Sequence, residues 1–217
     1  MKKQHTIALT LIAAAVVAGC ASTPSSADLD KMTADIIKSS FHDRGIVKVS
    51  VLNTDEINTV CSAADVAGKP LDSDVAIALQ NEQLKTIKWP ADGNYMGDWQ
   101  KGEKLAQSGK GLTWSDKADT QNGGNCYNCH QLDPAEISFG TIGPSLTGYA
   151  KTHGVLADPN SPASKAIVEY TWGKIYNSRA YSACSVMPRA VHNGIITEAQ
   201  AKDLMALLLD PKSPVNQ

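Results

Sequence analysis

The run Cys126-Tyr127-Asn128-Cys129-His130 brings two thiols and an imidazole together within five residues. This C-x-x-C-H spacing is typical of covalent attachment of a c-type haem. Two thiols three residues apart lie on one helical turn, where they can add to the two vinyl groups of one haem. The imidazole of the next residue, His130, then becomes an axial ligand of the iron. We therefore predict one covalently bound haem c.

Two other uses of a C-x-x-C pair fit this sequence less well. A structural zinc site requires a second pair of cysteine or histidine ligands at similar spacing, and the sequence contains none. A thioredoxin-like redox pair accompanies a βαβ pattern, which does not surround Cys126 and Cys129. Haem attachment is therefore the preferred interpretation of this motif.

The sixth iron ligand comes from a segment after the motif, or that position stays open. The candidates are Met187, Cys184, His192 and His153. Met187 is preferred because Pro188 stiffens the loop after it, and because a neutral thioether stabilises ferrous iron, which suits an electron carrier. His192 is its main competitor, whereas His153 is expected at the surface. Met205 falls in a helical stretch and is expected in the core.

A Gly143-Pro144 pair follows the motif closely enough to reach His130. A turn there can offer a backbone carbonyl to the Nδ1–H group of the imidazole, which fixes the ring orientation and the basicity of the ligand. The alternative is an ordinary surface turn. We assign Gly143 and Pro144 to the haem-binding residues, with Cys126, Cys129, His130 and Met187.

Two further cysteines, Cys61 and Cys184, remain for pairing. Export permits disulfides, and the simplest pairing joins these two to each other across more than a hundred residues. Such a bond contributes on the order of 4 kcal/mol in the chain-entropy model. The alternative is a free Cys184 thiol near the haem, as a ligand or a reactive group.

The first residues have the features of an export signal. Lys2 and Lys3 precede an apolar segment, residues 7–18, that is shorter than the roughly 20 residues of a membrane-spanning helix. Val17-Ala18-Gly19-Cys20 resembles a lipobox, which predicts cleavage after residue 19 and acylation of Cys20; the alternative is ordinary cleavage, with Cys20 incidental. We expect a signal peptide at 1–19, a flexible tether at 20–27, and a periplasmic protein held to a membrane by lipid.

The composition argues against a nucleic-acid-binding protein. Twenty Lys and Arg residues against 22 Asp and Glu residues give a net charge of −2. Residues 1–19 contain two Lys and no acidic residue, so removing them leaves 18 basic and 22 acidic residues and a net charge of −4. No basic surface of the kind that contacts phosphates is indicated.

Helical periodicity dominates the rest of the chain and predicts an all-α fold. Helices are expected at 28–41, from 53 or 54 through 61, from 73 or 74 to about 88, and at 98–106, 164–176 and 197–209, with one short strand at 46–51. Gly102 inside a helix costs about 1 kcal/mol relative to Ala, which indicates a close crossing by the last helix. Trp172 either packs on the haem edge or fills the core. We expect a helical extension at 28–90 and a haem domain at 91–217.

The order of first helix, haem motif, Gly143-Pro144, Met187 and last helix is similar to that of class I cytochromes c, over about residues 95–210. Four runs resemble more narrowly SoxX, the mono-haem subunit family of the SoxAX thiosulfate-oxidising cytochromes. They are Trp89-Pro90-Ala91-Asp92-Gly93, residues 123–132 around the haem motif, Gly140-Thr141-Ile142-Gly143-Pro144-Ser145-Leu146, and Cys184-Ser185-Val186-Met187-Pro188-Arg189.

The resemblance implies an electron-transfer subunit of an L-cysteine S-thiosulfotransferase complex. Its partners would be a SoxA-type cytochrome, the carrier protein SoxYZ, whose cysteine receives the thiosulfate, and a small cytochrome c that accepts electrons. The reacting haem of that family belongs to SoxA, and the chain shows no catalytic nucleophile or acid/base pair. Two alternatives remain: a stand-alone mono-haem electron carrier, soluble or lipid-anchored, and a haem sensor or structural haem protein with an open sixth position. Arg189 is either a partner of a propionate or carboxylate, or a solvated surface residue.

Overall fold

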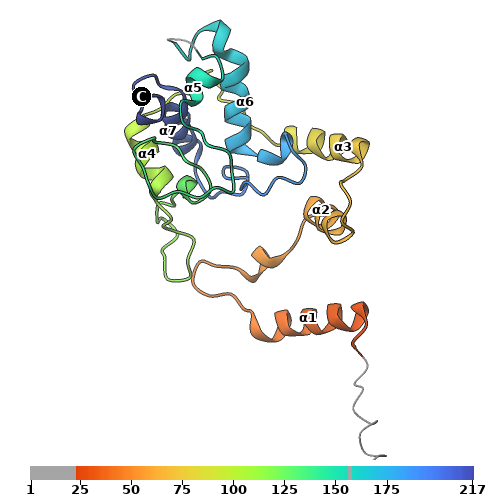
Figure 1. Ribbon diagram of the computed structural model, residues 1–217. Helices are drawn as coiled ribbons and strands as arrows, with labels where there is room; N and C mark the ends of the chain where they lie inside the picture. The colour runs from red at the N-terminus through yellow and green to blue at the C-terminus, as the bar shows by residue number, and fades with distance from the viewer. Residues whose placement is uncertain (1–22, 156–157) are drawn as a thin grey trace, which may run out of the picture. The chain divides into compact units, whose positions relative to one another are not determined.

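The computed structural model describes residues 23–155 and 158–217, and these residues form helices joined by irregular segments (Figure 1). No strand occurs among them, and an isolated bridge between Arg44 and Val47 is the β-type pairing they contain. The fold is therefore all-α, as predicted. The predicted signal peptide and the lipobox Cys20 lie outside the described residues.

The helices fall into two compact units, residues 1–43 and 44–217. The described part of the first unit contains α1 (Ser26–Ser40). Its start is fixed by a capping box, in which the Ser25 hydroxyl accepts from the Asp28 N–H and the Asp28 carboxylate accepts from the Ser25 N–H. The helix thus begins inside the predicted tether, two residues before the start expected from hydrophobic spacing.

The second unit contains all the other helices. Its α-helices are α2 (Glu56–Val66), α3 (Ser73–Leu84), α4 (Trp99–Gln107), α5 (Tyr149–Thr152), α6 (Lys165–Tyr176) and α7 (Glu198–Leu209). Its 3-10 helices are η1 (Val49–Leu52), η2 (Cys126–Asn128), η3 (Pro162–Ser164), η4 (Ser178–Ala180) and η5 (Pro214–Asn216). Helices α2 and α3 belong to the same compact unit as residues 91–217, the predicted haem domain.

The predicted strand at 46–51 is wrong. Arg44 and Val47 exchange two backbone hydrogen bonds of 3.0 Å around a turn in which Gly45 has a φ of 56°, and η1 follows directly. A strand needs a neighbouring strand to satisfy its backbone groups, and the described part of the chain offers none. Val49 and Val51 therefore lie in a 3-10 helix, in which Val51 is exposed.

The crossing of α4 and α7 is confirmed, and the two helices lie side by side (Figure 1). Gly102 is the point of closest approach: a Cβ there would lie 2.7 Å from the carbonyl carbon of Asp203 and closer still to its oxygen. Thr197 caps α7 as predicted, with Gln200 completing a capping box. The backbone of α7 is thus held directly against α4.

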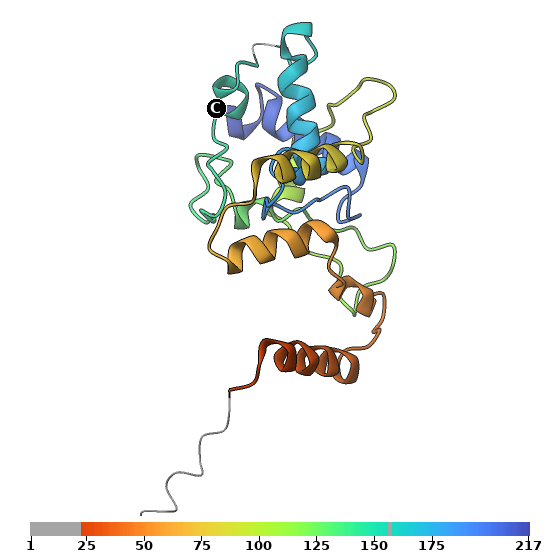
Figure 2. The same cartoon turned by 90° about the vertical axis from the view of Figure 1, so that its right-hand side faces the viewer.

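Helix α6 carries Trp172 into the middle of the core. Its side chain is fully buried, and the indole N–H donates to the carbonyl of Lys88 at 3.0 Å. Met205 of α7 is equally buried. Figure 2 shows α3 crossing in front of the lower end of α6. Trp172 and Met205 are therefore core residues, as was expected for Met205 and considered as one of two roles for Trp172.

Within residues 23–155 and 158–217, no helix has the length and apolar character needed to cross a membrane.

Candidate functional site

The C-x-x-C-H motif forms a single tight turn. Asn125 adopts a left-handed conformation with a φ of 51°, and η2 follows. The carbonyl of Cys126 accepts from the N–H groups of Cys129 and His130 at 3.1 and 2.9 Å. The two thiols are partly buried and are bonded neither to each other nor to another cysteine. One turn therefore presents two thiols and one imidazole.

A second segment, residues 140–146, runs alongside this turn. The N–H of Gly140 donates to the carbonyl of Tyr127 at 2.7 Å, that of Gly143 to Cys129 at 2.8 Å, and that of Leu146 to Gln131 at 2.8 Å. These three bonds span the motif from end to end. The Gly143-Pro144 pair is thereby held at the histidine.

The imidazole of His130 is oriented by that pair, as predicted. Its Nδ1 lies 2.7 Å from the carbonyl oxygen of Pro144. A carbonyl only accepts, so Nδ1 carries the proton and Nε2 keeps a free lone pair. Gly143 packs against the ring, because a Cβ there would lie 2.5 Å from Nδ1 and 2.7 Å from Nε2. Nε2 is therefore the ring nitrogen through which His130 could bind a metal.

A partly buried carboxylate supports the motif from α4, and the sequence analysis missed it. The hydroxyl of Tyr127 donates to Oε1 of Glu103 at 2.9 Å, and Gln107 donates to the same oxygen at 2.7 Å. The other oxygen, Oε2, is buried without a hydrogen-bond partner. Burial raises the pKa of Glu103, and it also raises the pKa of the Tyr127 hydroxyl. No local pattern pairs these residues, which lie 24 positions apart.

Burial raises the pKa of the Cys126 thiol to about 12. The thiol is therefore neutral near pH 7, and a neutral thiol is a poor metal ligand and a poor attacking group in disulfide exchange. Moreover, no group of three or more His, Cys, Asp or Glu side chains is arranged to hold a metal ion in the described part of the chain. The described residues thus provide no further ligands for a zinc ion at Cys126 and Cys129.

Met187 belongs to a second group of residues, in the irregular segment between η4 and α7. It is half-buried. Its carbonyl accepts from the Ser178 hydroxyl at 2.6 Å, and its N–H donates to the Ser185 hydroxyl at 3.2 Å. The backbone at the preferred second ligand is thus fixed on both sides.

The other candidates for the sixth iron ligand differ in their bonding and exposure. Cys184 is joined to Cys61 in a disulfide with a Cα–Cα distance of 5.5 Å, the pairing that the sequence predicted, so it is not a free thiol. His153 stacks on Tyr149, and its Nδ1 lies 2.9 Å from the carbonyl oxygen of that residue. His192 is exposed, and its pKa is lowered by partial burial and by the neighbouring Arg189. Met187 and His192 are thus the candidates whose side chains form neither a disulfide nor a hydrogen bond within the described part of the chain.

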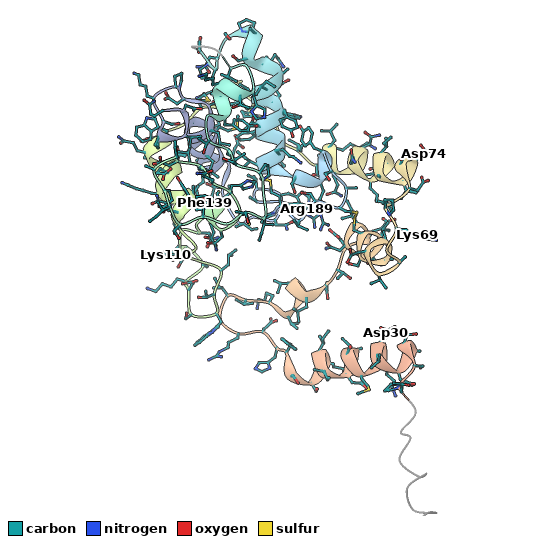
Figure 3. The ribbon with its side chains drawn as sticks, viewed as in Figure 1. Asp30, Lys69, Asp74, Lys110, Phe139 and Arg189 are labelled. Atoms are coloured by element: carbon teal, nitrogen blue, oxygen red, sulfur yellow. A yellow bond between two sulfur atoms is a disulfide. The ribbon has the colours of Figure 1, made fainter. Side chains whose placement is uncertain are left out.

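Arg189 is not a solvated residue, because it forms an ion pair within the protein. Its side chain is only 12% exposed and lies 2.5 Å from the carboxylate of Asp55, the N-cap residue of α2. Figure 3 shows it on the α3 side of the second unit. No sequence pattern indicated this pair, because its members lie 134 positions apart.

Comparison with known proteins gives a partial relative and no family. A protein of Aquifex aeolicus (strain VF5), described as an uncharacterized lipoprotein, is 41% identical to this chain over 138 residues. The match covers 63% of this chain and 61% of the relative. No protein-family model matches the chain. The name of the relative refers to a lipid anchor and to no reaction.

Proposed function

We propose that this chain is an exported mono-haem cytochrome c that transfers electrons. Cys126 and Cys129 would hold the haem by two thioether bonds, and His130 and Met187 would be the axial ligands of its iron. The observation that carries the proposal is the state of His130: its Nδ1–H is committed to the Pro144 carbonyl and its ring packs on Gly143, which leaves Nε2 for a metal.

Two further features fit a covalently bound haem. The two motif thiols are unpaired in a chain whose other described cysteines form a disulfide. Ile142 and Val186, which adjoin Gly143 and Met187 in the chain, are 74% and 84% exposed. Apolar side chains at such positions would cover the faces of a flat apolar group and be withdrawn from water with it. The residues present therefore suit this cofactor.

The arrangement of helices also supports a class I cytochrome c domain. The haem motif is hydrogen-bonded to α4 through the Gly124 N–H, which donates to the carbonyl of Leu105, and through Tyr127 and Glu103. Helix α4 in turn crosses α7 at Gly102. The first and last helices of the proposed domain thus brace each other and hold the motif at the end of α4.

A bound haem would supply one-electron transfer by cycling between ferric and ferrous iron. The residues of the chain would tune and protect that step. The Pro144 carbonyl increases the basicity of His130 and favours ferric iron, whereas the neutral sulfur of Met187 favours ferrous iron. The two effects oppose each other, so the reduction potential of the haem would depend on both ligands.

The more specific proposal is a SoxX-type subunit of a SoxAX complex. Two of the runs that resemble SoxX, residues 140–146 and 184–189, are the segments that contact His130 and carry Met187. Joining thiosulfate to a cysteine thiol of a carrier such as SoxYZ releases two electrons. This chain would receive them one at a time from the haem of a SoxA-type partner and pass them to a small cytochrome c.

We also propose that Cys20 carries a lipid. The lipobox-like Val17-Ala18-Gly19-Cys20 and the name of the Aquifex aeolicus relative support this. The protein would then lie in the periplasm, attached to a membrane. A Cys20→Ser variant should appear in the soluble periplasmic fraction while the wild type stays with membranes; equal distribution of the two would contradict the anchor.

Haem attachment is tested by export of the chain in cells that attach haem c. The wild type should retain haem after denaturing electrophoresis, and Cys126→Ala with Cys129→Ala should lose it. Ferric wild type should show the near-infrared sulfur-to-iron charge-transfer band. Met187→Ala should abolish this band and His192→Ala should retain it. A coloured wild type that lacks the band, and whose spectrum changes in His192→Ala but not in Met187→Ala, would assign the ligand to His192; a colourless wild type would refute the function.

The SoxX-type role is tested by gentle purification of the chain from its native host. A second, haem-bearing subunit should accompany it, and thiosulfate should reduce its haem only when that subunit and the carrier are present. Recovery of a single chain that exchanges electrons with unrelated redox proteins would instead establish a stand-alone carrier. Rapid carbon monoxide binding to native ferrous protein would indicate an open sixth position.

A further inference from the structure

The segment that carries Met187 is fastened to α2 and α3 at several points. A covalent bond joins Cys184, three residues before Met187, to Cys61 of α2. A charged pair joins Arg189, two residues after it, to Asp55. Both flanks of the methionine are therefore tied to the same neighbouring helix.

Polar contacts extend this attachment to α3 and to η4. The buried amide of Asn177 donates to Oε1 of Gln83 at 3.0 Å and to Oγ1 of Thr86 at 2.9 Å. Arg189 donates to the same oxygen of Gln83 at 3.2 Å. Gln83 thus links the two ends of the segment 177–189 through one side chain.

Asp55 is the central charge of this attachment. Its carboxylate accepts from the Asn58 N–H at 2.9 Å and lies near Arg179 and Arg189, whose side chains are only 15% and 12% exposed. Burial alone would raise the pKa of Asp55, but the Asn58 N–H and the Arg189 guanidinium outweigh it and hold the pKa below its usual value. The carboxylate is therefore charged at neutral pH, and two largely buried arginines depend on it.

The segment 177–189 has little regular structure of its own to hold a ligand. It contains one turn of 3-10 helix, η4, and no α-helix. A single thioether holds its position only if the loop that bears it is already ordered, because ordering a loop costs about 1–2 kcal/mol per residue in backbone entropy. The contacts from α2 and α3 supply that order before any ligand bond forms.

We propose that α2 and α3 act as a clasp that positions Met187 as an axial ligand, with Asp55 and the Cys61–Cys184 bond as its positioning elements. The inference rests on the proposed function, since it assigns a role toward the iron of that same site. It gives residues 44–90, which carry no chemical motif, a direct part in electron transfer. Without the clasp, Met187 would leave the iron more often, and external ligands would enter.

The test uses the full, haem-loaded chain and two changes to the clasp. Asp55→Asn keeps a side chain that caps helices well but removes the charge, and the paired change Cys61→Ser with Cys184→Ser removes the covalent tie. Asp72→Asn is the matched control, because Asp72 caps α3 in the same way but forms no ion pair in the structure. Circular dichroism verifies that each variant is folded.

The readouts are the near-infrared band of the ferric protein and the rate of carbon monoxide binding to the ferrous protein. Asp55→Asn and the serine pair should both weaken the band and raise the rate. For Asp55→Asn the increase should be at least about tenfold, the typical effect of losing a hydrogen bond to a charged group. Asp72→Asn should match the wild type. A merely stabilising role would lower the resistance to urea without moving either readout.

The outcomes separate the clasp from the function on which it rests. Clasp variants that stay folded and keep both the band and the slow carbon monoxide binding of the wild type would overturn the clasp alone. A wild type that lacks the band would overturn methionine ligation, and the clasp with it.

Discussion

Replacing Gly143 by alanine should disturb His130, the proposed iron ligand, directly. The new Cβ would lie 2.5 Å from Nδ1 and 2.7 Å from Nε2 of His130, whereas ordinary contact distances are about 3.5–4.0 Å. Residue 143 and the ring must therefore separate by about 1 Å. The 2.7 Å bond from Nδ1 to the Pro144 carbonyl would then exceed the usual hydrogen-bond range.

The expected cost combines two effects. Overpacking costs about 1–3 kcal/mol and a lost neutral hydrogen bond about 1 kcal/mol, so Gly143→Ala should lower the free energy of unfolding by about 2–4 kcal/mol. Loss of that bond also makes the imidazole less basic, which disfavours ferric iron. If the ferric protein is destabilised by about 1 kcal/mol relative to the ferrous protein, the one-electron reduction potential should rise by about 40 mV.

Urea unfolding and a redox titration of the haem-loaded protein measure these two effects. Pro144→Ala is the control, because it removes a ring but keeps the backbone carbonyl that accepts from His130, and its potential should stay within about 10 mV of the wild type on the same scale. An unchanged unfolding midpoint and potential in Gly143→Ala would refute the close packing of residue 143 on the imidazole.

Three further predictions concern the elements that support the site. Gly102→Ala should destabilise the protein by about 1–3 kcal/mol in urea, despite the roughly 1 kcal/mol gain in helix propensity, because the new Cβ meets the backbone of Asp203; a stabilised variant would contradict the crossing. Thr197→Ala should cost about 1 kcal/mol by removing the capping box of α7, and thermal unfolding would measure it. Burial raises the pKa of Glu103 above 4.5, so the native state binds a proton more strongly than the unfolded state. Its contribution to stability is therefore full below pH 4.5 and is lost as the pH rises through the raised pKa. Glu103→Gln should remove this loss of stability, which urea midpoints measured across pH would detect. An equal dependence of the midpoint on pH in the two proteins would refute the raised pKa of Glu103.

Features that depend on neighbouring residues were predictable from the sequence. Spacing identified α4, α6 and α7, and Thr197 was recognised as a cap because capping residues act within one turn. The contact between His130 and Pro144 followed from their short separation of 14 positions, which allows a loop to return. The Cys61–Cys184 bond followed from elimination among five cysteines.

Features that depend on distant charges were not predictable in the same way. Arg189 finds Asp55 across 134 residues, and Glu103 meets Tyr127 only because α4 packs behind the motif. Alternation of valines at 46–51 predicted a strand, but pairing depends on a partner strand that the described residues do not supply. That α2 and α3 fall in one compact unit with residues 91–217 likewise depends on long-range contacts, which no local composition marks.

The Cys61–Cys184 disulfide joins residues on either side of the C-x-x-C-H motif in the sequence. The order in which this disulfide and the proposed haem thioether bonds form therefore matters. Four thiols permit three sets of two disulfides, and two of those sets would trap Cys126 and Cys129 with the wrong partners. Even the third would close these two on each other. A chain that is unfolded under reducing conditions and reoxidised without haem should therefore form mispaired disulfides. A chain whose Cys126 and Cys129 are already bound to haem has one pairing left, Cys61 with Cys184.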